Sequence, residues 1–318
     1  MARSNGACIL ALLIVLAPQS SRAQSQLART FVSLVNGNDA NDCNRATPCR
    51  TFQRAHDNTL PSGEITVLDA GGYGAVNITK NISIINDGVG EAGILVSGGN
   101  TGAAINAGAG DAVTLRGLTI KGIGFGGGNG IVFTAGKALS VENCTVRNMD
   151  GGAIAGKGIA FTPTTASAKL SVSNTVVSDN LRTGIVIQPV VSESNSISRA
   201  VLTRVEVRNN GGDGILVDGE SAGFDVEVTI ADSVAAFNGG VGFRAFSLSG
   251  AAQVFVKLVR SLLASNGVGV GSDGGGTALV FLSGNTFVQT IELQNPDNNV
   301  RSYGDNEMFT SPILVSKH

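Results

Sequence analysis

The chain of 318 residues has no tryptophan, two tyrosines and two histidines. His56 and His318 are far apart in the sequence, so no Ser-His-Asp or Cys-His arrangement can be assembled around them. Without tryptophan, and with tyrosine only at positions 73 and 303, the middle of the chain has no row of these residues for a sugar site. Charged residues make up 14% of the chain, the net charge is −2 and no basic patch stands out, so we expect no nucleic-acid partner.

Long hydrophobic runs are also scarce. The apolar run at 9–17 is too short for a bilayer, which needs about 20 residues, and no other segment qualifies. We therefore expect no membrane span. Arg3 precedes this run, and Ser21 and Ala23 are small residues at the two positions that a signal peptidase reads. We interpret residues 1–23 as a signal peptide cleaved near Ala23 and expect a secreted or periplasmic protein.

What the chain does have is glycine and apolar residues in a repeating order. It contains 44 glycines and is 42% hydrophobic, a composition typical of a folded chain with many tight turns. Six positions recur at a step of 25 to 31 residues and serve as anchors: Gly117, Asn143, Asn174, Arg204, Asp232 and Arg260. The position two before each anchor is always apolar and reads Leu115, Val141, Val172, Leu202, Ile230 and Leu258. The positions four before and three after each anchor are apolar as well.

Polar residues alternate with these apolar positions, and a period of two indicates strands with one buried face. Strands that recur in the same direction must pair in parallel, because hairpins would reverse them. Stacked parallel coils form a β-helix, so we predict an all-β solenoid.

Two polar columns follow from the same register. The first lies six residues after an anchor and contains Asn180, Asn210, Asn238 and Asn266. We predict that these asparagines form a structural hydrogen-bonded ladder at turns with left-handed backbone. The second is the anchor column itself, where Arg204, Asp232 and Arg260 alternate in sign and predict an ion ladder that sets register.

The first part of the mature chain carries features of its own. An oxidising compartment would let Cys43 and Cys49 form a disulfide, with two free thiols as the alternative. Cys144 has no obvious partner and is interpreted as a packed thiol. Residues 51–57 predict a short helix that caps the N-terminal end of the stack, with Thr51 as its N-cap. We divide the mature chain into an N-terminal strand, loop and helix (24–64), coils (65–290) and a C-terminal coil and cap (291–318).

The N-terminal segment also carries a resemblance. It contains Phe31-Val32-Ser33, then Asn36-Gly37-Asn38-Asp39, then the run from Pro48 to Ala55. This order resembles the opening of many secreted right-handed parallel β-helix proteins, and the coil repeats resemble the pectate-lyase-like superfold. The resemblance covers nearly all of the mature chain and implies a right-handed parallel β-helix with a short N-terminal capping helix. It implies no single activity, since this superfold includes lyases, hydrolases, epimerases and non-catalytic surface proteins.

The motifs of the enzymes in this superfold are not matched. Asn174-Thr175 is followed by Val176, where polygalacturonase-like hydrolases have an acid, and no Gly-His-Gly occurs. A lyase of the pectate type would need acids clustered from neighbouring coils to bind calcium. The candidates for such a catalytic or metal cluster are Asp179, Arg208, Asp213, Asp218 and Glu220. An ordinary polar loop is the alternative interpretation of Asp218 and Glu220.

Three variable loops follow equivalent strands, at 162–169, 188–199 and 218–225. Loops diversify while coils keep the core constant, so we expect any binding surface there. The sequence favours a monomeric, non-catalytic exported β-helix without a cofactor, which presents this loop face to a polysaccharide or another surface protein. The alternative is a carbohydrate-active enzyme that acts on an acidic polysaccharide, and calcium is expected only in that case.

Overall fold

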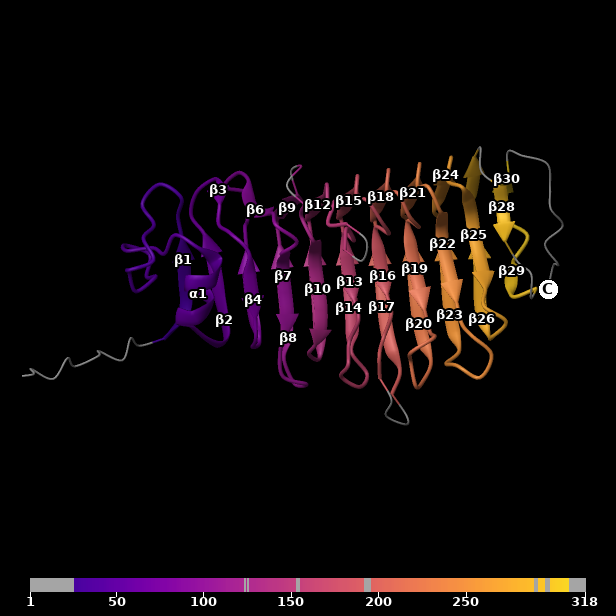
Figure 1. Cartoon of the computed structure of the whole chain (residues 1–318), viewed down its shortest axis with the longest axis horizontal. Coiled ribbons are helices and arrows are strands. Elements are labelled where there is room, and N and C mark those ends of the chain that lie inside the picture. The colour runs from indigo at the N-terminus through magenta and orange to yellow at the C-terminus, as the bar shows by residue number, and fades with distance from the viewer. Residues whose placement is uncertain are drawn as a thin grey trace, which may run out of the picture.

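The computed structural model describes residues 26–122, 124, 126–152, 155–191, 196–288, 291–294 and 298–308. The predicted signal peptide, part of the loop at 188–199 and much of the C-terminal segment lie outside these ranges. In the described part of the chain the strands form three parallel sheets with about nine full turns (Figure 1). No helix in these ranges is long and apolar enough to cross a membrane.

Each coil passes through sheet 1, then sheet 2, then sheet 3. Sheet 1 has eleven strands: β1 (Leu27–Val32), β2 (Thr59–Val67), β5 (Ile82–Ile85), β8 (Ala112–Arg116), β11 (Ala138–Glu142), β14 (Lys169–Ser173), β17 (Ser198–Thr203), β20 (Val226–Ala231), β23 (Val254–Val259), β26 (Ala278–Ser283) and β29 (Val300–Ser302).

Sheet 2 has ten strands: β3 (Gly71–Gly72), β6 (Ala92–Val96), β9 (Leu118–Gly122), β12 (Thr145–Arg147), β15 (Val176–Ser178), β18 (Glu206–Arg208), β21 (Val234–Ala236), β24 (Leu262–Ala264), β27 (Thr286–Val288) and β30 (Glu307–Met308). Sheet 3 has nine: β4 (Val76–Ile78), β7 (Thr101–Asn106), β10 (Asn129–Ala135), β13 (Ile159–Phe161), β16 (Ile185–Ile187), β19 (Ile215–Asp218), β22 (Val241–Phe246), β25 (Val268–Asp273) and β28 (Ile291–Gln294).

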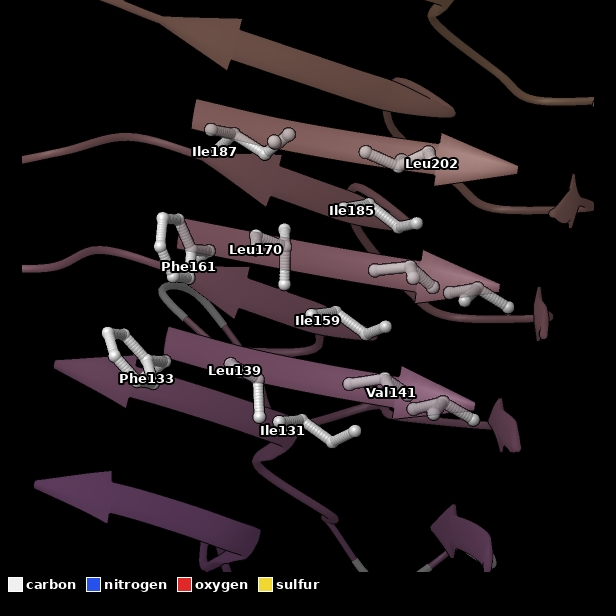
Figure 2. Close-up of a cluster of buried hydrophobic side chains, with 14 of the residues drawn as sticks. Ile131, Phe133, Leu139, Val141, Ile159, Phe161, Leu170, Ile185, Ile187 and Leu202 are labelled. Carbon is white, nitrogen blue, oxygen red and sulfur yellow. The ribbon is translucent and has the colours of Figure 1, made fainter. Parts of the chain in front are cut away.

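The apolar files are continuous, as the repeat predicts. Val172 pairs with Leu202, Leu202 with Ile230 and Ile230 with Leu258, each in the adjacent parallel strand. All four side chains are fully buried. Figure 2 shows this arrangement where side chains from β10, β13 and β16 face those from β11, β14 and β17. Burying each such side chain contributes about 1.5–3 kcal/mol, so the interior of the solenoid is its main source of stability.

Two turns in each of the middle coils have a left-handed residue. Sheet 1 connects to sheet 2 through the anchors, and Asn174, Arg204, Asp232 and Arg260 all have φ between 47° and 53°. Sheet 2 connects to sheet 3 through Asn148, Asp179, Asn209, Phe237 and Ser265, with φ between 52° and 60°. The predicted placement of left-handed backbone at the buried asparagines was therefore wrong by one position. Asp179, Asn209, Phe237 and Ser265 each come directly before one of those asparagines.

The buried asparagines themselves form a ladder. The side-chain amide of Asn180 donates to Asn210 Oδ1, that of Asn210 to Asn238 Oδ1 and that of Asn238 to Asn266 Oδ1, each at 2.9 Å. Each of these oxygens also accepts the backbone N–H of the preceding asparagine. The ladder thus satisfies polar backbone at the corner of every coil it passes through.

The ion ladder is incomplete. Arg260 donates to both carboxylate oxygens of Asp232, at 2.8 and 2.9 Å. Arg204 points the other way, and its Nε donates to Asn174 Oδ1 at 2.6 Å instead of pairing with Asp232. The prediction of an Arg–Asp–Arg series was wrong on the Arg204 side, because a neutral amide acceptor one coil earlier is the partner of that guanidinium.

The segment before the coils contains the disulfide and the helix. Cys43 and Cys49 are bonded to each other, and Cys144 is a buried free thiol. Helix α1 (Phe52–Asn58) begins after Thr51, whose hydroxyl accepts the N–H of Arg54 at 3.2 Å. Phe52 is fully buried and its ring lies 5.0 Å from that of Tyr73. Figure 1 shows α1 at the N-terminal end of the stack, beside β1 and β2.

Candidate functional site

The candidate site is on the outer surface of sheet 1, in its C-terminal half. Alternate residues of these strands point away from the core and line up across the sheet. One row runs across five strands and consists of Val201, Thr229, Lys257, Phe281 and Arg301. A second row consists of Arg199, Glu227, Phe255 and Leu279. We call these nine residues the outer face of sheet 1.

A groove runs over this face. It has a volume of about 520 Å³ and is lined by Asp225, Glu227, Val228, Thr229, Phe255, Lys257 and Phe281. Phe255 and Phe281 are only partly buried, so each presents part of its ring to solvent. The loop at 218–225 leads directly into β20, and its last residue, Asp225, is at the rim of the groove. This one of the three predicted loops therefore borders the sheet face.

Some charged side chains of the outer face form ion pairs and others do not. Arg199 Nε and Glu227 Oε2 form an ion pair at 2.8 Å in the second row. In the first row, Lys257 and Arg301 form no ion pair with any carboxylate among the described residues. Phe281 pairs with Lys257 on one side and with Arg301 on the other. The two cations are thus separated by two strand spacings, about 10 Å, with an aromatic ring between them.

The five candidates named from the sequence do not form one site. Asp213 precedes β19 and Asp218 ends it, so five residues, or about 16 Å of strand, separate them. Arg208 pairs with Glu206 at 2.5 Å on sheet 2, and Asp179 accepts a bond from Asn209 at a turn. No group of three or more His, Cys, Asp or Glu residues in the described part of the chain could hold a metal ion.

Asp218 and Asp213 each have hydrogen-bond or ion-pair partners that account for their presence by a structural role. Asp218 is 7% exposed, and its two oxygens accept from Gln188 Nε2 at 2.7 Å and from the backbone N–H of Glu220 at 2.8 Å. The latter bond closes the turn that contains Glu220, as expected of an ordinary polar loop.

Asp213 accepts the N–H of Val241 at 2.8 Å and lies 3.6 Å from the guanidinium of Arg244. Arg244 also pairs with Asp273 at 2.9 Å. Burial opposes the charge of Arg244, but bonding to Asp273 and the field of Asp213 outweigh it and raise the pKa of the guanidinium. Asp213, Arg244 and Asp273 therefore form an ion network between three coils on the outer surface of sheet 3.

Lys257, Phe281, Phe255 and Arg301 were not among the residues predicted from the sequence. A signal for two of them was present. The position three before each anchor reads Thr114, Ser140, Ser171, Val201, Thr229 and Lys257, and the residue aligned with Lys257 in the next coil is Phe281. Five uncharged residues, four of them with hydroxyl groups, are thus followed by a cation and an aromatic ring at an outward position, which marks a change in what that surface contacts.

Comparison with known proteins identifies the fold. A family model described as "Right handed beta helix region" matches residues 62–287. The search of curated proteins finds no match. Among solved structures, pectate lyase Pel9A is similar with a TM-score of 0.56 and 15% identity over 87% of this chain and 78% of that one. The GH136 lacto-N-biosidase from Eubacterium ramulus is similar with a TM-score of 0.53 and 14% identity over 88% of this chain and 67% of that one.

At these identities the structural likeness concerns the fold alone. It agrees with the three stacked parallel sheets, and the family match spans most of their length. The chain belongs to the right-handed β-helix family and has the fold of the pectate-lyase-like proteins.

Proposed function

We propose that this protein is an exported, non-catalytic β-helix that binds an acidic polysaccharide along the outer face of sheet 1. The observation that carries the proposal is the series Lys257, Phe281 and Arg301 across three adjacent strands. A flat ring suits the apolar face of a sugar, and a cation without a protein partner can bind a carboxylate through a charge-assisted hydrogen bond. The series runs along the solenoid axis, the direction in which an extended chain would lie.

The rest of the surface is consistent with this ligand. Phe255 adds a second ring, in the row next to Phe281, and the loop that ends at Asp225 adds a wall. Arg199 neutralises Glu227, which would otherwise repel an anionic chain from the same groove. Both solved structures compared above are carbohydrate-active enzymes by name, which agrees with a glycan as the partner class.

The absence of catalysis is part of the proposal and rests on the sequence. The motifs of the hydrolases are unmatched, and Glu227, one of the two acids that line the groove, is engaged by Arg199. Residues 1–23 direct export in this proposal, the mature protein is a monomer, and α1 closes the N-terminal end of the core. It needs no cofactor.

The proposal is tested by isothermal titration of the mature chain with polygalacturonate, with dextran as the uncharged comparison. We expect binding of polygalacturonate alone, weakened by salt because the contacts are charged. Lys257→Met and Arg301→Gln should each lower the affinity roughly tenfold, the loss of about 1.4 kcal/mol. Arg147→Gln is the matched control, since Arg147 is exposed on sheet 2 and forms no ion pair in the described structure.

Two results would count against the proposal. If polygalacturonate and dextran bind equally, or if Arg147→Gln weakens binding as much as Lys257→Met does, the outer face of sheet 1 is not the site. The same incubations, with and without calcium, should show no rise in the ultraviolet absorbance of an unsaturated uronate. Such a rise would show a lyase and support the enzymatic alternative.

A further inference from the structure

Sheet 1 ends at β1, and the structure shows how this end is covered. β1 pairs with β2 on one side only, and the strand order places it at the N-terminal limit of the sheet (Figure 1). An uncovered strand of this kind presents a row of free N–H and C=O groups to which another chain can add.

The loop between Cys43 and Cys49 occupies that free side. The N–H of Phe31 donates to the carbonyl of Cys43 at 2.8 Å, and the N–H of Ser33 donates to the carbonyl of Cys49 at 3.0 Å. In return the N–H of Cys49 donates to the carbonyl of Phe31 at 2.9 Å. All three bonds that cover the edge therefore involve one of the two residues joined by the disulfide.

The Cys43 end of this cover has an unfavourable backbone conformation. Cys43 has a φ of 65°, a region that residues other than glycine, asparagine and aspartate rarely adopt. The Cys49 end of the loop is held by further hydrogen bonds. The carbonyl of the neighbouring Pro48 accepts the backbone N–H of Asn38 and the side-chain amide of Asn41. Without the bond to Cys49, Cys43 can relax to a common conformation, and its carbonyl then leaves the N–H of Phe31.

The same loop covers a side chain. Two guanidinium groups lie near the ring of Phe31, that of Arg29 at 5.4 Å and that of Arg45, from the loop, at 5.7 Å from its centre. Opening the loop removes Arg45 and leaves an aromatic ring next to an unpaired strand. Both changes favour pairing of β1 with another strand.

We propose that β1 is a latent self-association edge that the Cys43–Cys49 disulfide keeps closed, and that the partner is a second copy of this chain. A dithiol reductant such as dithiothreitol supplies two electrons and two protons. The S–S bond breaks, Cys43 and Cys49 become thiols, and the reductant becomes a cyclic disulfide. Two exposed β1 strands then pair antiparallel around Phe31. Because both copies use the same edge, the contact closes as a dimer and does not grow.

The test is the mass of the mature chain in solution, measured by size-exclusion chromatography with light scattering. We expect a monomer when oxidised and a dimer with dithiothreitol, reversible on reoxidation. Cys43→Ser/Cys49→Ser should be dimeric without reductant. Cys144→Ser should behave as the unmodified chain does. Adding Arg29→Pro to the double variant should restore the monomer, because proline removes an N–H from an edge strand.

Hydrogen exchange at the amide of Phe31 provides a second measurement that does not need the variants to fold. It should be protected when oxidised, unprotected in the dilute reduced chain and protected again at high concentration. A reduced chain that stays monomeric, growth beyond a dimer, dimers that survive Arg29→Pro, or unchanged protection of Phe31 would each overturn the proposal. Glycan binding uses the opposite half of sheet 1, so either proposal can fail alone.

Discussion

Asn210 and Asn238 are hydrogen-bonded side chain to side chain in consecutive coils, and neither is more than 2% exposed. Asn210 also donates to the carbonyl of Val177 and accepts from both the backbone and the side chain of Asn180. The side-chain amide of Asn210 thus links its own coil to the coil before it and the coil after it, at a buried corner.

Replacing this amide should therefore cost more than an ordinary polar substitution. Asn210→Ala leaves two buried donors of Asn180 without their acceptor and removes one hydrogen bond to the carbonyl of Val177. We expect a loss of about 2–4 kcal/mol in the free energy of unfolding, measured by urea denaturation. Asn77→Ala, at an exposed outward position of β4, should change it by less than about 0.5 kcal/mol. Equal effects of the two substitutions would show that the ladder does not stabilise the fold.

Phe237 occupies a turn position better suited to another residue. Its φ is 57° and its side chain is 61% exposed, while the equivalent residue of the preceding coil is Asn209. Asparagine tolerates left-handed backbone better than phenylalanine does, so Phe237→Asn should stabilise the chain by about 0.5–1 kcal/mol. Phe237→Ala is the control, since it removes the same ring without relieving the backbone. A gain from the alanine variant equal to that from asparagine would refute this explanation.

His56 should make stability depend on pH. It is 4% exposed, its Nε2 accepts the N–H of Thr79 at 3.3 Å, and burial together with the charge of Lys80 lowers its pKa. Above the unfolded value of about 6.5 the imidazole is neutral in both states and stability is complete. As pH falls from there toward the lower folded pKa, the unfolded chain binds the proton first, so stability decreases.

The measurement is the free energy of unfolding at pH 7 and pH 5 for the natural chain and for His56→Asn. The natural chain should lose more stability than the variant between these two values. The difference between the two chains isolates His56 from the carboxylates, which titrate in both. A variant with the same pH dependence as the natural chain would exclude His56 as the cause.

The thiol of Cys144 should be unreactive toward alkylation in the folded protein. It is 2% exposed, and burial raises the pKa of its thiol to about 11. Because the thiolate is the reactive form, alkylation at pH 8 should be negligible. Mass spectrometry of the mature chain after iodoacetamide should show no adduct when it is folded and one adduct in guanidinium chloride without reductant. An adduct on the folded chain would mean that the coil around β12 opens readily.

The fold was largely predictable because burial constrains the same position in every coil. Val172, Leu202, Ile230 and Leu258 can be aligned from the sequence since each must be apolar, and the register pairs them as expected. The direction of a surface side chain has no such constraint. Arg204 can reach forward to Asp232 or back to Asn174, and only the structure shows that it reaches back.

The candidate site was harder to predict for a related reason. Asp213 and Asp218 drew notice by residue type, but Arg244 and Gln188, which explain them, come from other coils about 30 residues away. Lys257, Phe281 and Arg301 are unremarkable one at a time. They become a site only when the register places them on adjacent strands. The last coils, where Arg301 lies, follow the repeat too loosely for their register to be predicted from the sequence.

The stacking of corresponding positions in adjacent coils has a consequence for how such a molecule can diversify. Each coil contacts mainly the one before and the one after it. Duplication or deletion of a whole coil would therefore lengthen or shorten the molecule by one strand spacing and leave both ends intact. The length of such a solenoid can be matched to the length of a ligand by adding or removing whole coils, without changing any single contact.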